Sequence, residues 1–145
     1  MPVLFFWRGD NYAKDMKSSG KTYELNQNSK HMLDLRIRDR VWAFTRRENK
    51  EYVLAADLVV VRVVQNQPQD PGYVYGKYRA EGDTQKSRYF DIDKGVDAEW
   101  LIRSFSFSPQ ARVLGHSFRG QNGVRPLTSA DELKLIVFSI GLPTR

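Results

Sequence analysis

The chain has 145 residues and a mass of 16.8 kDa, which predicts a single domain over residues 1–145. Its 41% hydrophobic content excludes a disordered tail, and no apolar run reaches the length of a membrane span. The absence of cysteine excludes disulfides and thiolate metal sites and favours the reducing cytoplasm. The 23 Lys and Arg outnumber the 17 Asp and Glu, giving a net charge of +6 that suggests an anionic partner, with nucleic acid first.

The N-terminal segment is predicted to form a strand followed by a helix. Val3–Trp7 is apolar and aromatic, which favours a buried first strand. Asp10 or Asn11 is expected to cap a short helix that runs to about Lys17 and ends at Ser18-Ser19-Gly20.

Short extended segments are predicted next. Thr22–Leu25 is a strand candidate, and the polar residues 26–30 indicate a loop. Leu33, Leu35 and Ile37 alternate with charged residues, a period of two that predicts a half-buried extended segment.

A long hairpin is predicted in the middle of the chain. Val41–Thr45 forms its first strand, Arg46–Lys50 its turn and Tyr52–Val64 its second strand, which is long enough to bend within a small barrel. Because Leu58–Val61 is continuously apolar, both faces of the sheet are expected to be covered there.

Two more strands are expected beyond this hairpin. The two prolines of Gln65–Gly72 indicate a loop, after which Tyr73–Tyr78 and Ser87–Ile92 are predicted strands. A polar turn around residues 81–83 joins them.

Two helices are predicted in the C-terminal third. Asp97 is expected to cap a short helix in which Trp100, Leu101 and Phe105 share one face. Thr128 is the expected N-cap of the final helix, since Asp131 follows it at the capping position. The i, i+3, i+4, i+7 spacing predicts that the core-facing residues of this helix are Leu133, Ile136, Val137 and Ile140.

No catalytic or metal-binding motif is found. His31 and His116 are too far apart for a zinc motif, and the segment 115–120 has its second glycine one residue late for the G-x-S-x-G of a hydrolase. No glycine-rich phosphate loop occurs. The sequence therefore predicts a protein that is not an enzyme and that carries no metal or cofactor.

Aromatic side chains beside polar or basic ones remain as candidates for binding. An unpaired nucleobase needs stacking rings and hydrogen-bonding side chains, and its phosphates need Arg or Lys. The base-binding candidates are Trp7, Tyr23, Asn26, Asn28, Trp42, Ser117 and Phe118. The phosphate-binding candidates are Arg8, Arg46, Arg47 and Arg119. Tyr23 and Trp7 are expected to stack, and Asn26, Asn28 and Ser117 to read the base edge. A core position is the alternative for Trp7, Trp42 and Phe118.

Several segments resemble the EVE-like members of the PUA-like superfamily. Tyr23–Asn28 followed by Leu35–Phe44 is similar to the family's aromatic-x-x-Asn segment before "hydrophobic-x-x-Gly-Asp-x-valine-aromatic". Tyr52–Val64 resembles its long returning strand, and the stretch from Ser117 to Thr128 resembles its turn into the last helix. Two positions depart from the pattern, with arginine at position 38 for the family's glycine and tyrosine at position 23 where tryptophan is frequent.

The resemblance implies a curved, barrel-like sheet with a cleft that holds a flipped, often modified base of DNA or RNA. Members of this family occur alone and fused to nucleases or helicases, so a nuclease or helicase subunit is a candidate partner. With the element order, it predicts an α+β fold, a curved mixed β-sheet or pseudo-barrel of five or six strands with flanking helices. The expected function is non-catalytic nucleic-acid binding; the alternative is a protein-interaction or small-ligand module. The kind of base and the oligomeric state are left open.

Overall fold

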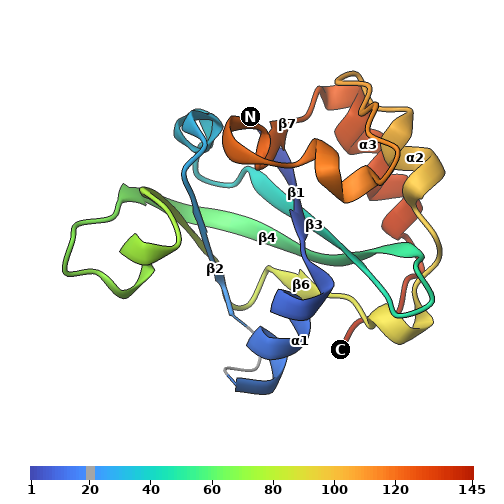
Figure 1. The fold of residues 1–145 in the computed structure, drawn as a ribbon, viewed down its shortest axis with the longest axis horizontal. Helices are drawn as coiled ribbons and strands as arrows, with labels where there is room; N and C mark the ends of the chain where they lie inside the picture. The colour runs from blue at the N-terminus through green and yellow to red at the C-terminus, as the bar shows by residue number, and fades with distance from the viewer. Residues whose placement is uncertain (19–21) are drawn as a thin grey trace.

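The computed structural model describes residues 1–18 and 22–145, which form an α+β fold around one curled sheet (Figure 1). The strands are β1 (Val3–Trp7), β2 (Glu24–Gln27), β3 (Arg40–Arg46), β4 (Tyr52–Gln65), β5 (Tyr78–Gly82), β6 (Arg88–Tyr89) and β7 (Val124–Pro126). The helices are α1 (Gly9–Ser18), α2 (Glu99–Arg103) and α3 (Ser129–Ser139). Short 3₁₀ helices lie at Lys30–Asp34, Pro71–Val74, Ile92–Lys94, Leu114–Ser117 and Gly120–Asn122.

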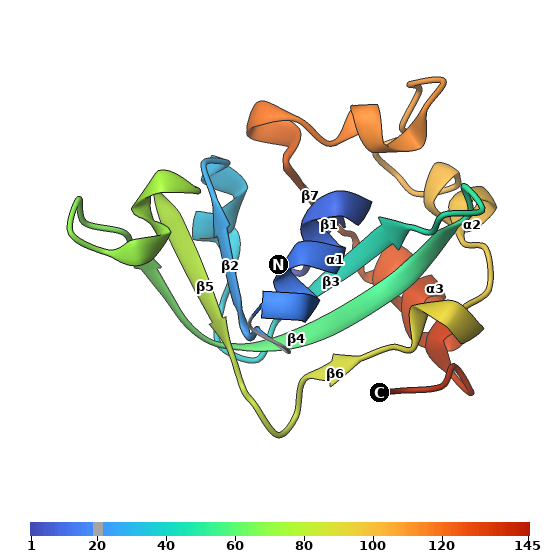
Figure 2. The same ribbon diagram turned by 60° about the horizontal axis from the view of Figure 1, so that its bottom comes forward.

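The sheet has the strand order β2-β5-β4-β3-β1-β7, with the two-residue β6 also paired to β4. The pairing of β1 with β3 is parallel and the other pairings are antiparallel, so the sheet is mixed. The 14-residue β4 spans the sheet, and irregularities in its pairings with β3 and β5 accompany its bend. Figure 2 shows the sheet curling around α1 as a half-barrel. The predicted curved mixed sheet with flanking helices is confirmed.

Two hydrophobic cores lie on opposite faces of this sheet. Alternation along β1 sends Val3 and Phe5 into the core on the α1 side, whereas Leu4 packs into the core beneath α2 and α3. Residues of α1 contribute to the first core, and residues of α2 and α3 contribute to the second. The sheet is therefore covered on both faces, which explains the apolar character of its central strands.

The predicted first strand is confirmed, but the predicted start of α1 is about two residues too late. The N–H of Tyr12 donates to the carbonyl of Arg8 at 2.8 Å, so the helical hydrogen bonds begin at Arg8 and Asp10 lies within the first turn. The predicted stop includes Ser19 and Gly20, which lie outside the described residues.

The segment after α1 departs from the prediction in two places. Residues 26 and 27, expected in a loop, extend β2 because they pair with β5. Leu33 and Ile37 are exposed, whereas Met32 and Leu35 are buried. The i, i+3 spacing of a 3₁₀ turn thus replaces the predicted period of two.

The hairpin of β3 and β4 is confirmed, and so is the turn between them. The part of β4 that is buried on both faces lies nearer its N-terminal end than expected, because residues 52–58 are all buried. Val61, in the segment expected to be covered, is 43% exposed.

The strand predicted at Tyr73–Tyr78 is wrong. Pro71 begins a 3₁₀ turn, a position that its fixed φ favours, and β5 begins only at Tyr78. Residues 81 and 82, the expected turn, lie in β5, and the strand expected from Ser87 is reduced to β6.

The caps and faces of the last two helices need correction. Asp97 does not cap α2; its carboxylate accepts the N–H of Tyr52 at 3.3 Å, and Trp100 is 64% exposed instead of sharing the buried face. The Thr128 cap of α3 is confirmed, because its Oγ1 accepts the N–H of Asp131 at 3.1 Å. The apolar face predicted to be buried in α3 is exposed, and the buried residues are Asp131, Leu135 and Ser139.

Candidate functional site: an arginine-lined cleft

A cleft of about 700 Å³ opens where the β1–α1 junction, the end of β3 and residues 113–119 meet. It is lined by Phe6, Arg8, Gly9, Asp10, Arg46, Tyr52, Val113, Gly115, His116, Phe118 and Arg119. Four of the predicted binding residues, Arg8, Arg46, Phe118 and Arg119, therefore share one surface although they are far apart in the sequence.

The floor of the cleft is a set of packed aromatic rings. Phe6 meets the ring of Tyr52 edge-on, with centroids 5.8 Å apart, and Phe118 packs edge-on against Phe44 at 5.0 Å. Gly115 lies directly on Phe6, since a Cβ there would be 2.5 Å from the Phe6 ring. Its N–H also donates to the Tyr52 hydroxyl at 3.3 Å. Only glycine allows this segment to come so close to the sheet.

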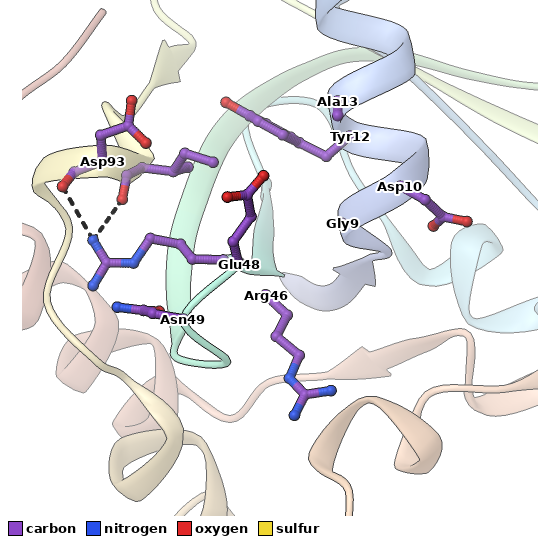
Figure 3. Close-up of a pocket in the computed structure, with 10 residues that line it drawn as sticks. Gly9, Asp10, Tyr12, Ala13, Arg46, Glu48, Asn49 and Asp93 are labelled. Carbon is purple, nitrogen blue, oxygen red and sulfur yellow. Dashed lines mark hydrogen bonds between the residues drawn. The ribbon is translucent and has the colours of Figure 1, made fainter.

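Arginines form the rim of the cleft. The guanidinium of Arg46 lies 5.5 Å from the centroid of the Tyr52 ring, and Figure 3 shows its side chain turned away from Glu48. Arg8 pairs with Asp10 at 2.8 Å. In the part of the chain that the structure describes, Arg46 and Arg119 are in no ion pair with a carboxylate. The lining thus has three arginines for one carboxylate and carries a positive field.

The single carboxylate of the rim is held ionised. The N–H of Asn11 donates to Asp10, and together with the nearby guanidinium of Arg8 it keeps the pKa of the Asp10 carboxyl below its ordinary value. Asp10 therefore neutralises Arg8 in part at neutral pH, and Arg46 and Arg119 supply most of the net charge.

A partly buried arginine, Arg125, holds the segment that contains Phe118 and Arg119. Arg125 donates two hydrogen bonds to the carbonyl of Ser117, at 3.0 and 3.3 Å, and its guanidinium stacks over Phe107. Burial lowers the pKa of Arg125. The hydroxyl of Ser117 accepts the N–H of Ala111 at 3.2 Å, so this side chain braces the segment and does not line the cleft.

A second hollow, of about 750 Å³, adjoins the cleft across Arg46 and is drawn in Figure 3. Its lining includes three carboxylates, those of Asp10, Glu48 and Asp93, whose negative charges would repel a phosphate group. Arg47 lies here, donating to the carbonyls of Ile92 and Asp93 at 2.9 and 3.2 Å and pairing with Glu51. Arg47 is therefore occupied by its own chain and does not line the cleft.

Trp7 and Tyr23 lie on the other face of the sheet. Trp7 packs edge-on against Tyr12 at 5.0 Å and donates to Asp15, while Tyr23 packs edge-on against Tyr89 at 5.8 Å. The ring of Tyr89 lies against those of both Trp7 and Tyr23, and burial raises the pKa of the Tyr89 hydroxyl. Because side chains alternate along β1, Phe6 enters the cleft and Trp7 does not.

The remaining candidates have partners within the fold. Trp42 is fully buried, and its Nε1 donates to Glu132 at 2.9 Å, so the core position is the correct one of its two predicted alternatives. The side-chain oxygen of Asn26 accepts from Asn66 at 2.9 Å, and that of Asn28 accepts from the N–H of Lys77 at 3.0 Å. The structure does not bring these three residues to the cleft.

The lining residues that the sequence did not single out include three with rings, Phe6, Tyr52 and His116. The alternation of β1 beside Arg8 carried a signal for Phe6, since it separates Phe6 from its neighbour Trp7. Nothing local identified Tyr52, because its place in the cleft depends on the packing of Gly115 against the sheet.

The described residues contain no group of three or more side chains able to hold a metal ion, and no helix among them is long and apolar enough to cross a membrane. Compared with models of known protein families, the chain matches none, and no curated protein matches it either.

Proposed function

We propose that this chain is a non-catalytic nucleic-acid-binding module whose arginine-lined cleft holds one nucleotide. The observation that carries the proposal is the convergence of Arg8, Arg46 and Arg119 from three segments around an aromatic floor. Guanidinium groups bind phosphate oxygens, and rings accept the faces of bases. The cleft volume lies within the roughly 300–1,000 Å³ typical of ligand sites.

In this proposal the position of each residue determines its role. Arg46 and Arg119 bind phosphate, and the base contacts Phe6 and Phe118. Trp7 and Tyr23 act from the opposite face of the sheet by fixing β1, which carries Phe6 into the cleft. As the resemblance to EVE-like domains implies, the nucleotide belongs to DNA or RNA and its base, plain or modified, is flipped out; a nuclease or helicase subunit is the candidate partner. The absence of cysteine supports a cytoplasmic setting.

Binding of labelled oligonucleotides, measured by fluorescence anisotropy at several salt concentrations, tests the proposal. The panel contains single strands and duplexes with plain, methylated and hydroxymethylated bases. Arg119→Ala and Arg46→Ala should each weaken binding by about 1 kcal/mol and lower the salt slope by about one unit. Arg36→Ala is the matched control, because Arg36 is an exposed arginine that does not line the cleft.

Tyr23→Ala tests whether Tyr23 contacts the base directly or acts only through the packing of the sheet. Loss of the Tyr23 ring should weaken binding less than the arginine substitutions do, because it acts only through the packing of the sheet. Absence of salt-dependent binding to every oligonucleotide would sink the proposal. Equal losses in Arg119→Ala and Arg36→Ala would instead show that the charge acts without the cleft.

A further inference from the structure

The outer surface of α3 is apolar. Leu133, Ile136, Val137 and Ile140 are 59%, 37%, 59% and 75% exposed, and together they are called the α3 face below. Their i, i+3, i+4, i+7 spacing is the spacing of helices that pack against another helix.

The opposite side of α3 is fixed on the protein by polar contacts. The carboxylate of Asp131 accepts the N–H of Ser106 at 3.1 Å, and Glu132 accepts the indole N–H of Trp42 at 2.9 Å. Ser139 lies 3.5 Å from the guanidinium of Arg88, and Leu135 is fully buried between these contacts. Turning α3 to bury its apolar face would break all three contacts, so they hold that face away from the described part of the protein.

The area of the α3 face fits an interface with a second copy of the chain. From the exposed fractions of its side chains, the face presents on the order of 400 Å² of apolar surface. A homodimer interface of standard size needs about 500 Å² of apolar surface per partner.

The charges on α3 also permit self-association. Lys134 is the one exposed charged residue of this helix, all of which the structure describes. Two copies of the face would therefore meet without like charges at the centre of the contact.

We propose that the chain forms a two-fold symmetric homodimer in which the two α3 faces pack antiparallel. In that arrangement Leu133 meets Ile140 of the second copy, and Ile136 meets Val137 near the two-fold axis. The residues that line the arginine cleft all lie outside α3, so both clefts stay open. The dimer does not depend on what the clefts bind.

Sedimentation velocity across a range of protein concentrations tests the dimer. The wild-type chain should sediment with twice the monomer mass of 16.8 kDa. Val137→Glu should raise the dissociation constant on the order of a hundredfold, because it buries an unpaired charge twice in each dimer. Val74→Glu is the matched control, since Val74 is also an exposed valine, 81% exposed and outside α3. Circular dichroism should show all three proteins folded.

A cross-linking experiment tests the geometry. Because the chain has no cysteine, Val137→Cys introduces a single thiol close to the proposed axis. Mild oxidation should give a disulfide-linked dimer with Val137→Cys and none with Val74→Cys. A monomeric wild type at all concentrations, or a Val137→Glu variant as dimeric as wild type, would overturn the proposal. Equal cross-linking of the two cysteine variants would do the same.

Discussion

The contact between Trp42 and Glu132 should be one of the interactions that fix the orientation of α3. The indole N–H donates to the carboxylate at 2.9 Å across the interface between β3 and α3. A hydrogen bond to a charged group contributes about 1.5–3 kcal/mol, and because Glu132 is only partly buried we expect about 1–2 kcal/mol. Trp42→Phe also removes part of a fully buried side chain, which adds about 1–3 kcal/mol.

A double-mutant cycle isolates the hydrogen bond from the packing. Urea unfolding of Trp42→Phe, Glu132→Ala and the double variant should give a coupling free energy of about 1–2 kcal/mol. Lys134→Ala, at the exposed neighbouring charge, should change the free energy of unfolding by less than about 0.5 kcal/mol. A coupling free energy below about 0.5 kcal/mol would refute the reasoning that this bond holds the polar side of α3 inward.

Three further predictions concern the cleft, the α3 cap and an ion pair. Gly115→Ala should lower the free energy of unfolding by about 1–3 kcal/mol and weaken oligonucleotide binding, since its Cβ collides with Phe6; unchanged urea unfolding would contradict the close contact. Thr128→Ala should cost about 1 kcal/mol in thermal unfolding through the lost α3 cap, and Thr128→Ser should restore most of it. The hydrogen bond from Arg62 lowers the pKa of the Glu81 carboxyl below 4.5. The ionised Glu81 therefore stabilises the fold at neutral pH, and this stabilisation is lost as the pH falls below that value. Wild type should therefore lose more stability than Glu81→Gln between pH 7 and pH 3, and equal pH profiles would argue against the pair.

The central strands could be predicted because their signal is local. Val3–Trp7 and the hairpin of β3 and β4 consist of apolar and β-branched residues with a clear turn between the last two. The Thr128 cap is equally local, because donor and acceptor lie three residues apart. Such elements need no knowledge of the rest of the chain.

The candidate site was predicted only in part. The basic residues of the cleft could be identified, because Arg8 and Arg119 each follow an aromatic residue and Arg46 belongs to the basic turn of the hairpin. Their meeting at one cleft depends on Gly115, whose missing side chain lets residues 113–119 approach Phe6. Phe6 and Trp7 are neighbours on the chain but point to opposite faces of the sheet, so proximity in sequence does not bring Trp7 to the cleft.

The last helix, α3, shows most clearly what the sequence determines and what only the tertiary structure decides. Sequence alone determined that residues 129–139 form a helix with one apolar face, because capping and periodicity act within a few turns. Only the tertiary structure decided which face meets the sheet. Asp131 and Glu132 find hydrogen-bond donors there, and buried polar groups are costly without partners, so these contacts set the orientation and leave Leu133, Val137 and Ile140 outside.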